Sequence, residues 1–212
     1  RPVAISNDAN CFALSEATDG AGTGSESVFG VIIGTGTGAG IVINGTVLNG
    51  SNGIAGEWGH NPLPWPEENE LPGNTCWCGQ NGCIETWLSG PGMTKDHAKH
   101  TGATLTAREI TLAAASDDED ANQTLMRYES RLARGLSHII NTIDPQVIVL
   151  GGGMSNIERL YNNVPVLWEK WIFSDHVNTK LVAPAYGDSS GVRGAAWLGS
   201  RLTNTGNDGT LE

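Results

Sequence analysis

The sequence predicts an α/β protein with a mixed sheet flanked by helices. Short apolar runs at 28–33 and 147–150 each end in glycine, which is typical of buried strands. An Asn-Gly pair at 44–45 lies between two further apolar runs and predicts a β-hairpin. Helical patterns at 107–115 and 121–143 separate this hairpin from the later strand. A strand, a hairpin, helices and then strand, glycines and helix is the order of an α/β fold.

The other elements follow in chain order. Residues 1–5 are expected to end a strand, and Asn7 or Asp8 is a candidate N-cap for an apolar helix that reaches Ala17. Asp144-Pro145 ends the second long helix. The later predictions are a helix from Ser155 past Leu167, a strand at 180–183, a short helix at 192–198 and a disordered tail from Thr203.

Composition limits the classes of function. The chain has 212 residues, 29 of them glycine, which fits one globular, loop-rich domain or lobe. A formal net charge of −11 disfavours nucleic-acid binding, because an acidic domain gains nothing from counterion release. Apolar runs of membrane-spanning length are absent, so we expect no membrane partner. We expect a cytoplasmic protein.

A cysteine cluster lies in the long, aperiodic segment at 49–95, which needs an organising element. Cys76, Cys78 and Cys83 fall within eight residues, and His60 precedes them. Cys76-Trp77-Cys78 is too tight for an unstrained disulfide. Three thiolates and one imidazole would close a tetrahedral shell, so we expect structural Zn²⁺ here and a reducing compartment. Ordinary reduced cysteines are the alternative.

Two glycine-rich segments are candidates for nucleotide binding. Gly34, Thr35 and Gly36 open a glycine-rich loop at 34–40, where backbone N–H groups can approach phosphate oxygens. This loop is neither a P-loop nor a dinucleotide fingerprint. Gly151-Gly152-Gly153 follows a strand and precedes a helix, where α/β sheets bind nucleotides. A purely structural hairpin and a tight turn are the respective alternatives.

A polar set completes the candidates, and its members are acids, an amide and an imidazole that can bind sugar hydroxyls. They are Asn7, Asp8, Glu57, His60 and Glu85. One carboxylate could take the proton of an attacking hydroxyl. A helix cap is the alternative for Asp8, and a solvated surface position is the alternative for Glu57 and Glu85.

Taken together, these segments resemble the ROK family of sugar kinases and repressors over nearly the whole chain. The stretches that carry the resemblance are 7–10, 34–40, 56–60, 76–85, 144–145 and 147–153. The resemblance implies an actin-like (ribonuclease-H-like) ATPase fold, with residues 1–212 as its carboxy-terminal lobe and a zinc-bound loop at about 57–95. The family opens with an amino-terminal phosphate-loop lobe that this chain lacks, so we expect the chain alone to be inactive.

The resemblance also implies roles. Asp8 would be the general base, and Asn7, Glu57, His60 and Glu85 would hold the sugar, with His60 also on Zn²⁺. Thr35 and Gly36 would lie near the phosphates of ATP, Gly151 to Gly153 near the adenosine, and Mg²⁺ would bridge the phosphates.

The segments 56–65 and 187–196 most resemble bacterial fructokinases of the manno(fructo)kinase type. We therefore expect a hexose kinase that converts fructose to fructose 6-phosphate. The family resemblance also implies a homodimer, because members of the family are often dimers. N-acetylglucosamine, glucose or mannose is the alternative substrate. A sugar-sensing repressor lobe and a non-catalytic zinc-stabilised domain are the alternatives from other classes.

Overall fold

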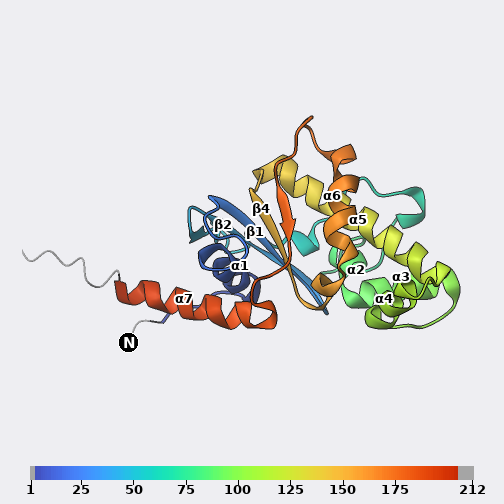
Figure 1. Cartoon of the computed structure of the whole chain (residues 1–212), viewed down its shortest axis with the longest axis horizontal. Helices are drawn as coiled ribbons and strands as arrows, with labels where there is room; N and C mark the ends of the chain where they lie inside the picture. Colours follow the sequence, from blue (N-terminus) through green and yellow to red (C-terminus); the bar gives the residue numbers. More distant parts are fainter. Residues whose placement is uncertain (1–2, 205–212) are drawn as a thin grey trace, which may run out of the picture.

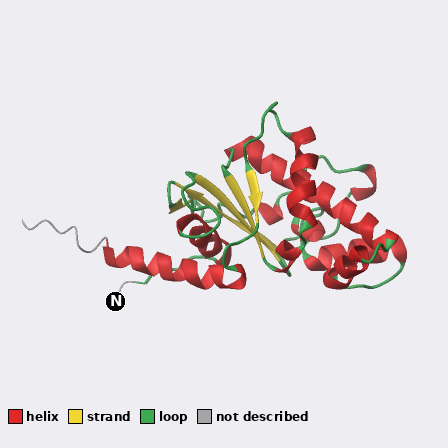
Figure 2. Cartoon of the chain, viewed as in Figure 1, coloured by secondary structure: helices red, strands yellow, loops and turns green. Residues whose placement is uncertain are grey.

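A computed structural model of the chain describes residues 3–204, the last four by their backbone alone. Five strands form one mixed sheet in the order β3-β2-β1-β4-β5 (Figures 1 and 2). The strands are β1 (Ser27–Ile33), β2 (Thr37–Ile43), β3 (Thr46–Val47), β4 (Val147–Gly151) and β5 (Lys180–Val182). β1 pairs antiparallel with β2 and parallel with β4, which confirms the predicted mixed α/β sheet.

Helices cover both faces of this sheet. Those of the first half are α1 (Asp8–Thr18), η1 (Trp58–His60), η2 (Glu68–Glu70), α2 (Glu85–Leu88), α3 (Gly90–Thr101) and α4 (Ala107–Ala115). Those of the second half are α5 (Glu119–Ile143), η3 (Gly153–Asn156), α6 (Arg159–Trp168), η4 (Glu169–Trp171), η5 (Gly187–Ser189) and α7 (Ser190–Asn204). Figure 1 shows α1 and α7 on one side of the strands and α2 to α6 on the other. Within residues 3–204, no helix is both long and apolar enough to cross a membrane.

The strands bury side chains on both faces, because successive residues point to opposite sides. Phe29 and Val31 join the larger core with α5, whereas Val28 joins the smaller core with Phe12 and Ala13 of α1. The continuous apolar runs that predicted the strands follow from this double burial.

Several predicted boundaries are wrong. The segment 34–40 is a short turn followed by a strand, because Thr37 already pairs with Ile33 across the hairpin. Residues 3–7 form no strand, and the helix expected from Ser155 is divided between η3 and α6. The last helix is longer than expected, so Thr203 and Asn204 are helical, and the rest of the predicted tail lies outside the described residues.

Two glycines bring α1 unusually close to the sheet. A Cβ atom at Gly40 would lie 2.6 Å from the carbonyl oxygen of Ala9, and one at Gly30 would lie 2.8 Å from the Cα of Ala13. These positions therefore need glycine for close approach. The contact places the first turn of α1, which carries Asp8, against the beginning of β2.

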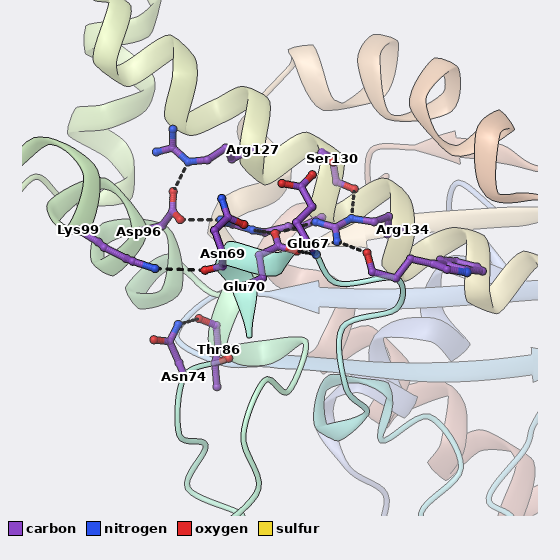
Figure 3. Close-up of polar contacts among 12 residues, drawn as sticks. Glu67, Asn69, Glu70, Asn74, Thr86, Asp96, Lys99, Arg127, Ser130 and Arg134 are labelled. Carbon is purple, nitrogen blue, oxygen red and sulfur yellow. Dashed lines mark hydrogen bonds and ion pairs between the residues drawn. The ribbon is translucent and has the colours of Figure 1, made fainter. Parts of the chain in front are cut away.

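A buried ion network fastens the long segment between β3 and α2 to the helices (Figure 3). We call it the Glu70 network; its members are Glu70, Asp96, Arg127, Arg131 and Arg134. Arg134 donates two hydrogen bonds to the Glu70 carboxylate, at 2.7 and 2.8 Å, and a third to the Trp65 carbonyl at 2.7 Å. Arg131 joins the Glu70 carboxylate to Asp96 of α3, at 2.7 and 2.8 Å.

Glu70 is 4% exposed, so its charge depends on these partners. Burial by itself raises the pKa of Glu70, but the hydrogen bonds from Arg134 and Arg131 outweigh it and lower that pKa to about 2. An unfolded glutamate has a pKa of about 4.3. The network therefore stabilises the fold fully above about pH 4.3, and this stabilisation is lost as the pH falls through about 2.

Replacing Glu70 with Gln should destabilise the chain by about 3–5 kcal/mol, because two guanidinium groups lose their shared buried counter-charge. Urea denaturation at neutral pH measures the loss. Glu68→Gln, which changes an exposed neighbour in the same 3-10 helix, is the matched control and should change little. Below about pH 4 the difference between wild type and Glu70→Gln should shrink. A pH-independent difference would contradict the assigned role of the Glu70 charge.

Candidate functional site

The His60, Cys76, Cys78 and Cys83 side chains converge into one cluster. Their ligand atoms all lie within 4.8 Å of one another. His60 Nδ1 lies 3.5 Å from Cys76 Sγ, and Cys78 Sγ lies 3.6 Å from Cys83 Sγ. A tetrahedral Zn²⁺ site, with Zn–S of about 2.3 Å and Zn–N of about 2.0–2.1 Å, has S···S edges of about 3.8 Å and S···N edges of about 3.5 Å. The two measured edges are close to these values, so the cluster is compact enough to hold this ion, and no pair of its cysteines forms a disulfide.

Local backbone geometry produces the cluster. Gly79 and Gly82 adopt φ values of +88° and +74°, which side chains rarely tolerate. The first turn is closed by a 2.8 Å hydrogen bond from the Cys76 N–H to the Gln80 carbonyl. After the second, Cys83 pairs with Pro62 as an isolated β-bridge, beside the segment that carries His60.

The thiols of the cluster differ in their pKa values. Burial, followed by hydrogen bonds with the other two thiols, raises the pKa of Cys83 to about 12. The backbone hydrogen bond with Gln80 is the largest cause that lowers the pKa of Cys78. A divalent cation among the sulfur atoms would favour the thiolate forms that coordination requires.

Glu85 connects this cluster to β2. Its Oε2 accepts a 2.9 Å hydrogen bond from the Thr37 backbone N–H, and its Oε1 accepts a 3.0 Å hydrogen bond from the Trp77 indole. Cys76 Sγ lies 4.0 Å from the same Oε1. Glu85 is half-buried, and each of its carboxylate oxygens accepts a hydrogen bond. The alternative interpretation of Glu85 as a solvated surface residue therefore does not hold.

Asn7 and Asp8 divide the roles at the start of α1. Asn7 is the N-cap, and its side-chain oxygen accepts a 2.7 Å hydrogen bond from the Asn10 N–H. The helix-capping role that was the alternative for Asp8 is therefore taken by Asn7. Asp8 is exposed, and its Oδ1 accepts only the N–H of Ala9, at 2.9 Å, among the hydrogen bonds of the described residues.

The predicted sugar-site residues come from three segments that all touch the first half of β2. Gly56 and Gly59 each let the chain approach this strand, because a Cβ atom would meet the carbonyl oxygens of Ala39 and Thr37 respectively. Each of these glycines directly precedes a candidate sugar-binding residue, because Glu57 follows Gly56 and His60 follows Gly59. Glu85 binds Thr37 itself, and Ala9, beside Asp8, covers Gly38 and Gly40.

A cavity of about 1180 Å³ opens on the other side of the glycine turn. Gly34, Thr35 and Gly153 line it, as expected for nucleotide contacts. Its other lining residues are mixed. Pro91, Ala98, Ala107, Leu112, Met154 and Ile157 are apolar, whereas four threonines, Lys95, Arg108 and Asn156 are polar. A cavity of this size that combines apolar side chains with hydroxyl and cationic groups is suited to a nucleotide.

The other three predicted glycines do not line this cavity. A Cβ atom at Gly151 would meet the Phe12 ring at 2.6 Å, and one at Gly152 would meet the Ile33 carbonyl oxygen at 2.4 Å. Both are therefore packing positions. Gly36 instead faces Glu85, whose Oε2 would lie 2.7 Å from a Cβ atom there.

Sequence reasoning missed three residues of this region. Trp77 lies against His60, with ring centroids 4.8 Å apart, and donates to Glu85. Its position between two cysteines was the available signal. Lys95 and Arg108 line the cavity and bring positive charge to an acidic chain. They lie outside any motif, so only the fold could identify them.

Comparisons with known proteins agree with this geometry. The model of the ROK family matches residues 1–201. An N-acetyl-D-glucosamine kinase of Photobacterium profundum is 44% identical over 202 residues, which are 93% of this chain and 67% of that protein. Seven further curated relatives, 38–42% identical, have the same description.

Solved structures share the fold. A ROK hexokinase of Thermus thermophilus is 31% identical with a TM-score of 0.84, over 95% of this chain and 67% of that one. A ROK glucokinase of Streptomyces griseus, solved with glucose and AMPPNP, is 28% identical with a TM-score of 0.81, over 93% and 68%. A ROK transcriptional regulator, a homologue of the E. coli MLC protein, is 27% identical with a TM-score of 0.80, over 95% and 52%. The chain belongs to the ROK family.

Proposed function

We propose that this chain forms the sugar- and nucleotide-binding part of an ATP-dependent sugar kinase that phosphorylates N-acetyl-D-glucosamine. The amino sugar is supported by eight curated relatives, each described as an N-acetyl-D-glucosamine kinase, at 38–44% identity. The chain spans 67% of the length of the first of these relatives. That a further lobe is required for turnover, and that the protein is a homodimer, stay predictions.

The expectation of fructose is not supported. It depended on two short segments, 56–65 and 187–196, whereas the amino-sugar kinases match over 202 residues. In the first segment, Gly56, Trp58 and Gly59 are packing residues, and in the second, Gly194 packs against Cys11 of α1. Residues at packing positions are constrained by the fold of the family, so they do not discriminate between sugars.

The observation that carries the kinase proposal is that the two candidate binding sites meet across one turn. Gly34 lines the large cavity, and Gly36, two residues later, lies against the Glu85 carboxylate. Phosphoryl transfer depends mainly on holding the donor phosphate and the acceptor hydroxyl close together and in line. A nucleotide in the cavity and a sugar beside Glu85 would have the Gly34–Gly36 turn between them.

In this proposal Asp8 accepts the proton of the attacking sugar hydroxyl. Its carboxylate is exposed at the end of a helix held rigidly against β2, so it is open to a ligand and fixed in position. Glu57, His60 and Glu85 bind the other hydroxyls. Because His60 Nδ1 faces Cys76 Sγ, the opposite ring nitrogen would face the sugar.

The nucleotide site needs little charge from the protein. Backbone N–H groups of the glycine turn would approach the phosphates, and Lys95 and Arg108 of the cavity would add positive charge. ATP supplies the phosphoryl group, and Mg²⁺ neutralises its oxygens when bound. Zn²⁺ in the cysteine cluster would have a structural role, because four protein ligands leave no open position.

A second candidate function is a sugar-sensing lobe without catalysis. The similarity to a ROK transcriptional regulator supports it. The net charge of −11 and the exposed Asp8 beside the sugar-site residues favour the kinase. Sugar binding without phosphoryl transfer, together with binding of duplex DNA by the longest encoded form of the protein, would favour the regulator.

The kinase proposal predicts ADP release that depends on the sugar. The longest encoded form of the protein, loaded with Zn²⁺, is assayed with N-acetylglucosamine, fructose, mannose and glucose. N-acetylglucosamine should give the highest kcat/KM. Selective turnover of fructose would restore the original expectation, and no turnover with any sugar by a folded protein would contradict the kinase.

Replacing Asp8 with Asn should lower kcat by about 10²–10⁴-fold, because the general base is lost while the fold is kept. Steady-state ADP release measures the change, and sugar affinity should remain close to that of the wild type. Asp175→Asn removes a second exposed aspartate and is the matched control. Unchanged turnover in Asp8→Asn would exclude Asp8 from the mechanism.

Replacing Cys78 with Ser should reduce bound zinc from about one equivalent per chain and lower the melting temperature at the same time. Metal analysis by mass spectrometry and thermal unfolding measure both quantities. Cys11→Ser alters the one cysteine outside the cluster and should keep its zinc. If Cys78→Ser keeps full zinc and stability, the assignment of the cluster as a zinc site is wrong.

A further inference from the structure

Trp77 is the most exposed tryptophan of the described chain, yet it is held on two sides. Its side chain is 81% exposed. Its indole N–H donates a 3.0 Å hydrogen bond to Glu85 Oε1. Its ring meets the His60 imidazole edge-on, with centroids 4.8 Å apart and planes at 88°. Tryptophan has a single polar group, a donor, and here that group is used on a carboxylate of the candidate sugar site.

The hydrogen bond completes a clamp on Glu85. Oε2 is held by the backbone N–H of Thr37 at 2.9 Å, and Oε1 by Trp77 at 3.0 Å. The two donors come from different parts of the chain, the start of β2 and the cysteine loop. A glutamate side chain has several rotatable bonds, and fixing both oxygens selects one orientation before a ligand arrives.

Core packing does not explain this tryptophan. Trp58 and Trp168 are each 2% exposed and belong to the larger core, whereas Trp77 leaves most of its ring in solvent. Its backbone position is nevertheless fixed, because Cys76 and Cys78 on either side both belong to the four-residue cluster. An exposed aromatic ring beside hydroxyl-binding groups fits a ligand with one polar edge and one apolar face, as a pyranose has.

We propose that Trp77 is a positioning residue of the sugar site. Its indole N–H orients Glu85 to receive a sugar hydroxyl, and its exposed ring forms an apolar wall beside His60. The cysteine cluster thereby acts on the substrate through Trp77 as well as through His60. This inference rests on the proposed sugar-kinase function, and its test separates the two.

The test compares two variants of Trp77 by calorimetric titration of N-acetylglucosamine into the Zn²⁺-loaded protein in its longest encoded form. Trp77→Phe keeps a ring and removes the donor, and it should weaken sugar binding about tenfold, the effect of losing one hydrogen bond to a charged group. Trp77→Ala removes both and should weaken binding further. The KM for ATP, the zinc content and the melting temperature should stay at wild-type values in Trp77→Phe.

Trp197→Phe is the matched control, because Trp197 is a partly exposed tryptophan on α7, remote in sequence from the cysteine loop. Equal sugar affinity in Trp77→Phe and this control would overturn the positioning role. Loss of zinc together with sugar binding in Trp77→Phe would also overturn it, since the residue would then only support the cluster. A wild-type protein that binds no sugar would instead refute the proposed function, and this inference with it.

Discussion

The buried carboxylate of Glu70 and its two arginines are the constraint on which the candidate site depends. The segment from β3 to α2 contains His60 and all three clustered cysteines, and its longest regular elements are single turns of 3-10 helix. Burying charges is costly unless each is paired. Here Arg134 and Arg131 both bind Glu70, and Arg131 continues to Asp96 of α3, a helix that also lines the large cavity. One network therefore holds the segment that carries the cysteines against a helix that lines the large cavity.

The residues of the proposed sugar site all lie against the beginning of β2. Its residues Thr37 to Gly40 are small, and three other segments approach them at distances that a larger side chain would prevent. The start of α1 and the segment around Gly56 and Gly59 contact this strand through their backbones, and α2 contacts it through the Glu85 carboxylate. A site built from backbone contacts of a buried sheet is stiffer than one built from loop tips, which suits a reaction that depends on alignment.

Predictions from the sequence succeeded where the determining forces are local. The Asn44-Gly45 hairpin, the helix at 107–115 and the buried strands follow from turn chemistry and from the periodicity of apolar residues. The cysteine cluster follows from spacing, because Gly79 and Gly82 need only short-range turns. The predicted nucleotide-binding glycines divide into two groups. Gly34 and Gly153 line the large cavity, whereas a Cβ atom at Gly151 or Gly152 would meet Phe12 or Ile33, so nucleotide contact of these two glycines stays a prediction.

The sequence by itself therefore determined the fold class, the family and the residues of the cysteine cluster. Only the tertiary structure decided which residues surround them. Glu70 and Arg134 are separated by 64 positions, and Thr37 and Glu85 by 48. No periodicity or motif encodes such pairs, because their contact depends on how the sheet and helices pack and not on the residues between them. Trp77 illustrates both parts. Its place between two cysteines can be read from the sequence, but its hydrogen bond to Glu85 exists only in the folded chain.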